Sequence, residues 1–306
     1  MTRKYLVATA TAAILTIAAG AANAGLPAAL QSRNGGDGIF IDASQVDNFR
    51  KPGRLVIIDI RVPERYAKGH IPGAISIPRE EIETPEVNGV MVETKSYYEL
   101  QPVFAKAGLT YDDTIIVYGE RDGWRGPKAG LHAGKIYVSL NQAGFDKVHV
   151  LDGGIEGWKG ELSKTPTVLP PTDFKLTKTK PTIVDKEYVR ARLGREKEGI
   201  FVLDFGIEER YARSHIKGAH DVGMGLFTDT NKLRDSLDGF QARLTEIGVK
   251  KDSEIIASCG WGWAAADGLA LLKDLGYTNI KLYDGSWTEW AQDPTTPKAG
   301  SLYDKP

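Results

Sequence analysis

The residue best suited to chemistry in this chain is its only cysteine. Cys259 follows a strand-like run at residues 254–258 and precedes a loop of small residues and tryptophans that leads into a helical pattern. A thiol between a strand end and a helix N-terminus meets free backbone N–H groups and the positive end of the helix dipole. Such surroundings stabilise a thiolate, so we predict a reactive nucleophile and not an inert buried side chain.

The loop after the cysteine is predicted to cradle an anion with its backbone. The predicted cradle consists of Gly260, Trp261, Gly262, Trp263, Ala264 and Ala265. The two glycines allow the loop to curl so that successive N–H groups point inward. The loop contains no charged residue and no hydroxyl group. A compact dianion therefore finds little cationic help, and a monoanionic or larger organic ligand fits better.

Side chains outside the loop are expected to assist. Arg210 and Arg213 flank Tyr211 and are candidate substrate-binding residues, because a guanidinium can grip a carboxylate or sulfonate through two N–H groups. Asp204 ends a predicted strand and is expected to support the loops by accepting hydrogen bonds from backbone N–H groups. No cluster with metal-ligand spacing and no phosphate-binding loop is present, so we predict no metal and no cofactor.

The elements that must position these residues occur twice along the chain. Residues 55–74 recur as residues 200–219, and residues 150–158 recur as residues 282–290. Each copy contains short continuous apolar runs that alternate with helical patterns, which is typical of a parallel sheet covered by helices on both faces. We therefore predict an α/β fold made of two tandem domains, each with a small parallel sheet.

The repeat also sets the predicted boundaries. The first domain covers residues 37–162, a proline-rich linker covers 163–181, the second domain covers 182–293, and a tail covers 294–306. Proline favours extended backbone, so the linker is expected to be semi-rigid. In the alignment of the two copies, Gly119 of the first domain stands where the second has Cys259, which predicts that the first domain is inactive.

The paired motifs resemble those of the tandem-domain rhodanese family of sulfurtransferases, of the thiosulfate and 3-mercaptopyruvate types. Residues 66–74 (Tyr-Ala-Lys-Gly-His-Ile-Pro-Gly-Ala) match the family's N-terminal signature, and residues 283–290 (Tyr-Asp-Gly-Ser-Trp-Thr-Glu-Trp) match its C-terminal signature. The resemblance implies that Cys259 accepts sulfur from a small donor as a persulfide and passes it to a thiol, to cyanide or to a protein acceptor. It also implies structural roles for His70 and His215.

Departures from the family pattern bear on the donor. The loop is similar to that of the 3-mercaptopyruvate enzymes, but Trp261 replaces a small residue, Trp263 replaces valine and Ala264 replaces threonine. The resemblance would place an arginine two positions after the strand aspartate. The first domain has Arg61 there, whereas the second has Gly206.

Two other functions compete with sulfur transfer. The Trp-rich loop also suits a protein-binding module, or a slow or non-catalytic carrier of persulfide or selenium. A cysteine phosphatase or arsenate reductase would need arginine six positions after the cysteine, where this chain has Ala265.

The N-terminus resembles an export signal. Residues 1–24 combine a basic start, an apolar stretch and a small-x-small site ending at Ala24, which predicts cleavage there and a periplasmic or secreted protein without a membrane anchor. A net charge of −1 with interspersed acids and bases gives no basic patch for nucleic acid. One cysteine also excludes an internal disulfide, so two apolar cores must stabilise the fold.

Overall fold

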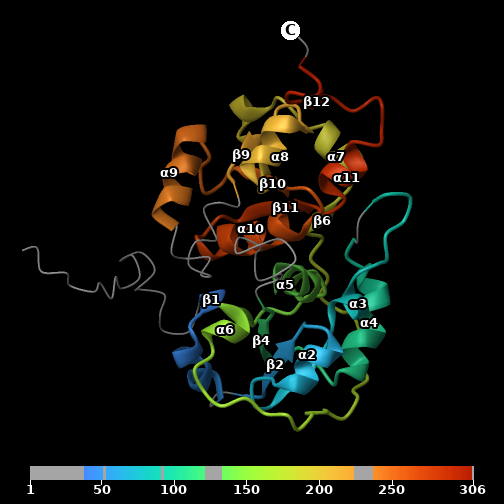
Figure 1. Cartoon of the computed structure of the whole chain (residues 1–306), viewed down its shortest axis with the longest axis vertical. Helices are drawn as coiled ribbons and strands as arrows, with labels where there is room; N and C mark the ends of the chain where they lie inside the picture. Colours follow the sequence, from blue (N-terminus) through green and yellow to red (C-terminus); the bar gives the residue numbers. More distant parts are fainter. Residues whose placement is uncertain (1–37, 51–52, 91–92, 121–132, 224–236, 305–306) are drawn as a thin grey trace, which may run out of the picture. The chain divides into compact units, whose positions relative to one another are not determined.

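The computed structural model describes residues 38–50, 53–90, 93–120, 133–223 and 237–304, and the predicted export signal lies outside them. Residues 36–306 form one compact unit that contains both repeats. Each repeat is built on a five-stranded sheet whose strands are all parallel. Helices flank both sheets, as Figure 1 shows. The predicted α/β class with two tandem parallel sheets is confirmed.

The first sheet has the strand order β1-β5-β4-β2-β3. Its strands are β1 (Phe40–Ile41), β2 (Leu55–Asp59), β3 (Ala74–Ser76), β4 (Thr114–Tyr118) and β5 (Val148–Leu151). Strands β2 and β4 pair along their whole length, and the register places Asp59 opposite Tyr118 at their carboxyl ends.

The second sheet repeats this order as β6-β11-β10-β7-β9. Its strands are β6 (Ile183–Val184), β7 (Ile200–Asp204), β9 (His220–Asp221), β10 (Glu254–Ser258) and β11 (Asn279–Tyr283). Asp204 lies opposite Ser258. Cys259 follows Ser258 directly, so the thiol lies at the carboxyl edge of the sheet, where the sites of parallel α/β domains form.

Helices connect the strands of both repeats. Those of the first repeat are η1 (Ala43–Arg50), α2 (Pro63–Lys68), α3 (Arg79–Ile82), α4 (Tyr97–Lys106), α5 (Ala133–Gln142) and α6 (Gly154–Gly157). Those of the second are α7 (Lys186–Arg190), η3 (Glu196–Glu198), α8 (Glu208–Arg213), α9 (Leu237–Ile247), α10 (Trp263–Asp274) and α11 (Ser286–Trp290). A short antiparallel pair, β8 (His215–Ile216) with β12 (Lys298–Ala299), joins the C-terminal segment to the second repeat.

Each sheet buries an apolar cluster against its helices. The cluster of the first repeat includes Val46, Phe49, Ile57, Ile116, Tyr118 and Leu151. The cluster of the second includes Val189, Val202, Ile256, Tyr283 and Trp290. The short apolar runs of the sequence thus form the core of the sheets, because strands covered on both faces bury consecutive side chains.

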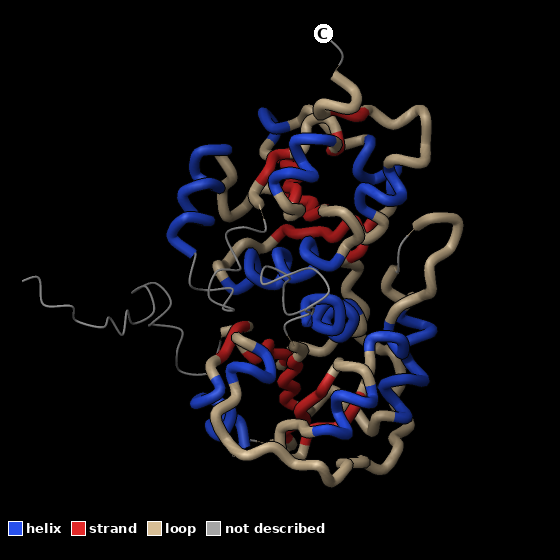
Figure 2. The backbone as a smooth tube through the Cα atoms, in the orientation of Figure 1, coloured by secondary structure: helices blue, strands red, loops and turns tan. Residues whose placement is uncertain are grey.

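The predicted linker, residues 163–181, forms no helix or strand apart from one isolated bridge, and it runs along the first repeat (Figure 2). Ser163 and His70 exchange backbone hydrogen bonds of 2.8 and 2.9 Å. The Lys180 N–H donates to the Gln142 carbonyl at 2.8 Å. The linker is therefore fixed to the first repeat along its length, in keeping with its proline-rich composition.

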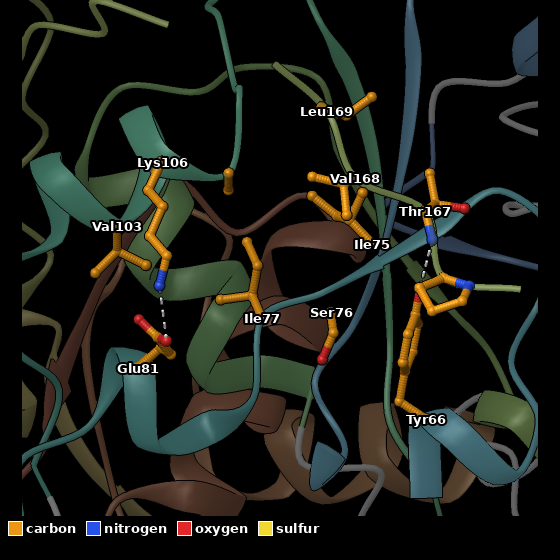
Figure 3. Close-up of a pocket in the computed structure, with 12 residues that line it drawn as sticks. Tyr66, Ile75, Ser76, Ile77, Glu81, Val103, Lys106, Thr167, Val168 and Leu169 are labelled. Atoms are coloured by element: carbon orange, nitrogen blue, oxygen red, sulfur yellow. Dashed lines mark hydrogen bonds and ion pairs between the residues drawn. The ribbon is translucent and has the colours of Figure 1, made fainter. Parts of the chain in front are cut away.

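A pocket of about 270 Å³ lies between this linker and the first repeat (Figure 3). Ile75 and Val168 are among its apolar lining residues, and at its side the Thr167 N–H donates to the Tyr66 hydroxyl at 3.0 Å. None of its lining residues belongs to the Cys259 loop, so this pocket is separate from the predicted site.

Helices α5 and α10 hold equivalent places in the two repeats and pack against each other. The Gly134 N–H donates to Asp267 Oδ1 at 2.8 Å. A Cβ atom at position 134 would lie 2.5 Å from the Ala266 carbonyl carbon, so only glycine allows this approach. The first repeat is thereby brought against the helix that follows Cys259.

Candidate active site

Cys259 is 4% exposed, and its sulfur accepts a hydrogen bond from the loop backbone. The Gly262 N–H donates to Sγ with a nitrogen–sulfur distance of 3.1 Å. The cysteine's own N–H donates to Ser286 Oγ at 3.1 Å, and its carbonyl accepts from the Trp287 N–H at 3.0 Å. The thiol is thus held in place with a backbone donor aimed at the atom that bears the charge of a thiolate.

Gly262 shapes the turn from the loop into α10. Its φ of +84° is in the left-handed region, and it is the residue that caps the N-terminus of α10. A Cβ atom here would overlap the Asp284 carboxylate and would lie 3.2 Å from Lys135 Nζ. Both the backbone and the space therefore require glycine. The N–H that reaches the sulfur is consequently the one at the positive end of the helix.

The other predicted cradle residues have different roles. The Gly260 carbonyl accepts from the Thr288 N–H at 3.1 Å, which ties the loop to α11. Trp261 and Trp263 are partly exposed, with ring centroids 6.0 Å apart and planes at 71°. Ala264 is partly exposed and Ala265 is buried in α10. Among the residues of the predicted cradle, Gly262 is the one whose N–H donates a hydrogen bond to Sγ.

The first repeat contributes residues to this loop that the sequence did not reveal. The Arg79 guanidinium lies over the Trp263 ring, 3.8 Å from its centroid. Lys135 Nζ pairs with Asp284 Oδ1 at 2.6 Å, and the two side chains are 1% and 2% exposed. The Thr94 N–H donates to the other Asp284 oxygen at 2.5 Å. These contacts cross between repeats, so no pattern within one repeat signals them.

Ser286 is a second residue that sequence reasoning missed. Its φ of +49° is unusual for a residue other than glycine, and the equivalent Gly154 of the first repeat has a φ of +55°. The Ser286 hydroxyl accepts from the Cys259 N–H and donates to the Tyr283 carbonyl at 2.8 Å. A strained serine is thus present where glycine would be easier, and its hydroxyl holds the nucleophile's backbone. The signal was the exchange of glycine for serine between the copies.

Arg210 was predicted to bind substrate, but its guanidinium is engaged with Asp204. Arg210 Nη2 pairs with Asp204 Oδ1, and Nη1 donates to the Ser214 carbonyl at 3.2 Å. A Cβ atom at Gly206 would overlap that guanidinium, so Arg210 fills the space that a side chain at position 206 would take. Asp204 also accepts from the Gly206 N–H at 2.8 Å. Burial raises the pKa of the Asp204 carboxyl.

The remaining predicted residues are not the donors of the hydrogen bond described above to the Cys259 sulfur. Arg213 ends α8 and is exposed. His70 and His215 stack on Tyr66 and Tyr211, with ring centroids 3.9 and 3.8 Å apart. Each histidine Nδ1 lies within hydrogen-bond distance of the carbonyl of the tyrosine on which it stacks. The histidines therefore fix the turns after α2 and α8.

Two groups close to the Glu289 carboxylate have raised pKa values. Desolvation, followed by the carboxylates of Asp284 and Glu289, raises the pKa of Glu93. Burial also raises the pKa of Tyr283, which lies near Glu289.

Among the residues that the structure describes, no group of three or more His, Cys, Asp or Glu side chains is placed to hold a metal ion. In the same residues, no helix has the length and apolar character needed to cross a membrane.

Comparison with known proteins assigns the family. The model of the rhodanese-like domain matches the chain twice, at residues 42–161 and 185–293. The chain therefore belongs to the rhodanese-like family, with two copies of the domain, and its relatives are sulfurtransferases. The chain is 28% identical to the thiosulfate sulfurtransferase YnjE of Escherichia coli over 78% of this chain and 57% of that relative, so the match spans less than two thirds of YnjE.

Relatives with two kinds of donor in their names match about equally well. The thiosulfate sulfurtransferase of Azotobacter vinelandii is 28% identical over 79% of this chain and 90% of its own length. The 3-mercaptopyruvate sulfurtransferase of Escherichia coli is 27% identical over 78% of this chain and 86% of its own length.

Solved structures share the fold. The structure of YnjE superposes with a TM-score of 0.71 at 22% identity, covering 86% of this chain and 68% of that one. An anaerobic ergothioneine biosynthesis enzyme from Chlorobium limicola, solved in complex with trimethyl histidine, superposes with a TM-score of 0.76 at 19% identity, covering 87% and 71%.

Proposed function

We propose that this protein moves a sulfane sulfur from a small anionic donor to a thiophilic acceptor through a persulfide on Cys259. The observation that carries the proposal is the Gly262 N–H, 3.1 Å from the Sγ of a nearly buried cysteine at a strand end. A preformed donor at this atom stabilises the thiolate, both as attacking and as leaving group, without further reorganisation.

Two displacements account for the transfer. With 3-mercaptopyruvate, the Cys259 thiolate attacks the donor sulfur, a sulfur–sulfur bond forms and the carbon–sulfur bond breaks. The bonding electrons leave with the carbon as the enolate of pyruvate, and the enolate takes up the proton released by the new persulfide. A thiolate or cyanide then attacks the outer sulfur, and the electrons of the sulfur–sulfur bond return to the Cys259 thiolate.

An organic donor suits the site better than thiosulfate. Residues 259–265 contain no charged side chain, and Arg210 is engaged by the buried Asp204 carboxylate. Thiosulfate carries two charges on a compact group and needs more cationic compensation than a monoanion. The backbone N–H at the sulfur serves either donor, so the preference depends on the surroundings of the loop.

Intact mass spectrometry tests the function directly. The protein, and separately Cys259→Ser, is incubated with 3-mercaptopyruvate or with thiosulfate, weighed, treated with cyanide and weighed again. We expect wild-type protein to gain one sulfur atom that cyanide removes, faster with 3-mercaptopyruvate, and Cys259→Ser to gain none. If neither donor labels Cys259, sulfur transfer from these donors is wrong.

The tryptophan pair supports a second candidate. Trp261 and Trp263 are partly exposed in the loop itself, as expected of a docking surface on a persulfide or selenium carrier. Turnover separates the two functions: an enzyme produces thiocyanate from excess donor and cyanide over many cycles, whereas a carrier loads one sulfur and stops.

A further inference from the structure

The Cys259 loop carries no charge of its own, although its proposed donors are anions. In the second repeat, Arg210 is paired with Asp204. In the described part of the chain, the cations whose contacts reach the loop come from the first repeat. They are Lys135, beside Gly262, and Arg79, on the Trp263 ring.

Lys135 is committed to a buried ion pair. Its ammonium lies 2.6 Å from the Asp284 carboxylate, and both side chains are almost fully buried. Turning Lys135 toward a ligand would leave a buried carboxylate without its cation, which is strongly unfavourable. Lys135 therefore holds Asp284 and the turn at Gly262 in place, and it is not the group that receives a donor.

Arg79 is arranged differently. Its side chain is 26% exposed, and its guanidinium lies 3.8 Å from the centroid of Trp263. Stacking uses the face of the guanidinium and leaves the N–H groups on its edge. Its acidic neighbour, Glu83, is nearly buried and forms an ion pair with Nε at 3.6 Å, which is longer than the 2.6 Å pair of Lys135 and engages the inner nitrogen of the guanidinium. The terminal amino groups, at the far end of the fork, are those suited to a bidentate carboxylate.

The backbone of Arg79 is fixed by the first sheet. Its N–H donates to the Ile60 carbonyl at 3.2 Å, directly after the carboxyl end of β2. Arg79 also opens α3, following Pro78. The arginine therefore projects from an ordered strand end, so little conformational entropy remains to be lost when a ligand binds.

We infer that Arg79 binds the carboxylate of the sulfur donor, so that the inactive repeat supplies the cation that the Cys259 loop lacks. This inference rests on the proposed function and names the donor class as small carboxylates. Trp263 orients the guanidinium by its ring face, which accounts for an aromatic residue at the first position of α10.

Steady-state kinetics with matched donors test the inference. The donors are 3-mercaptopyruvate and its methyl ester, which lacks the negative charge. Loss of a charge-assisted, bidentate contact in Arg79→Gln should raise KM for the acid about 10- to 100-fold, with kcat changed less than about threefold. KM for the ester should stay the same. Arg79→Lys keeps the charge but not the fork and should fall between.

A matched arginine controls for charge alone. Arg65 is also in the first repeat, is 54% exposed, and pairs with Glu120 at 2.8 Å. Arg65→Gln should leave KM for both donors unchanged. Equal increases for acid and ester in Arg79→Gln would show a merely structural role and overturn the inference, as would no increase for either.

A binding measurement separates this inference from the proposed function. Calorimetric titration with pyruvate, the carboxylate product, needs no turnover. We expect wild-type protein to bind pyruvate and Arg79→Gln to bind it about 10-fold or more weakly. If no donor transfers sulfur but pyruvate binding still depends on Arg79, the carboxylate site stands and the transfer function fails. Equal binding by both proteins, or none by wild type, overturns the site.

Discussion

In each repeat an aspartate ends a central strand, and different residues donate hydrogen bonds to it in the two repeats. In the first, Asp59 Oδ1 accepts from the Arg61 backbone N–H at 2.9 Å, and Oδ2 accepts from Arg61 Nη2 at 2.7 Å and from the Tyr118 hydroxyl at 2.5 Å. In the second, Asp204 Oδ1 accepts from Gly206 and Arg210, while Oδ2 has no hydrogen-bond partner among the described residues.

The strand residue opposite the aspartate changes as well. Ser258 stands where the first repeat has Tyr118, and its hydroxyl is fully buried without a hydrogen-bond partner among the described residues. Ser258 directly precedes Cys259. In the copy without a cysteine, both oxygens of the aspartate accept hydrogen bonds, whereas the copy that carries the thiol has unsatisfied polar atoms at the end of its strand. Such departures gather at functional sites, where the surrounding structure holds them.

The two repeats pair the strand aspartate with arginines from different positions. Arg61 reaches Asp59 from two positions later and also donates to the Gly69 carbonyl at 2.7 Å. Arg210 reaches Asp204 from six positions later, through the space left by Gly206. The carboxylate thus keeps a cation in both copies, although the arginine comes from a different element.

The largest expected effect comes from breaking this pair. Arg210→Ala removes the cation of a buried carboxylate and should lower the free energy of unfolding by about 2–4 kcal/mol. The double variant Gly206→Arg/Arg210→Ala rebuilds the arrangement of the first repeat and should restore at least half of the loss. Urea unfolding followed by tryptophan fluorescence measures this, because four of the six tryptophans lie in the second repeat.

Arg213→Ala is the matched control for this experiment. Arg213 is exposed at the end of the same helix, so its loss should change the free energy of unfolding by less than about 0.5 kcal/mol. If the double variant is no more stable than Arg210→Ala alone, the two arginines do not substitute for each other.

The sequence predicted what depends on local pattern. The short apolar runs gave both sheets, and the alignment of Gly119 with Cys259 distinguished the two copies. The sequence also shows that Gly206 stands where the first repeat has Arg61. It does not show which side chain fills the space beside Gly206, because that depends on how α8 packs against β7. The contacts of Arg79 and Lys135 with the Cys259 loop depend on how α3 and α5 pack against the second repeat, which periodicity within one repeat does not encode.

A smaller effect tests the paired helices. Lys273 of α10 and Asn141 of α5 hold equivalent positions, and Lys273 Nζ donates to Asn141 Oδ1 at 2.6 Å. Burial lowers the pKa of Lys273 to about 8, from 10.5. Below the lower value the charge is present in both states, and its burial destabilises the fold. As pH rises toward 10.5, the folded state loses this proton before the unfolded state does, so stability increases.

A variant without the Lys273 charge isolates the contribution of this group to the pH dependence of stability. Between about pH 7 and pH 10, wild-type protein should gain about 1–3 kcal/mol of unfolding free energy relative to Lys273→Met, which has no charge to lose. Urea midpoints at the two pH values measure the difference. A gain of the same size in Lys273→Met would assign the pH dependence to other groups.

The smallest effect on stability should come from exchanging the strained serine for the residue of the first repeat. Ser286→Gly relieves the positive φ but removes the hydroxyl that accepts from the Cys259 N–H. The two changes oppose each other at roughly 1 kcal/mol each, so the free energy of unfolding should change by less than about 1 kcal/mol. Sulfur transfer should nevertheless fall about 3- to 10-fold, because the peptide of the nucleophile loses its anchor.

The reciprocal variant completes the comparison. Gly154→Ser places a side chain at a φ of +55° in the copy without a cysteine, so it should cost about 1 kcal/mol of stability and leave transfer unchanged. Steady-state thiocyanate formation and urea midpoints, measured on both variants, decide the outcome. If Ser286→Gly keeps full transfer, the strained serine serves the fold of the second repeat and not the position of its thiol.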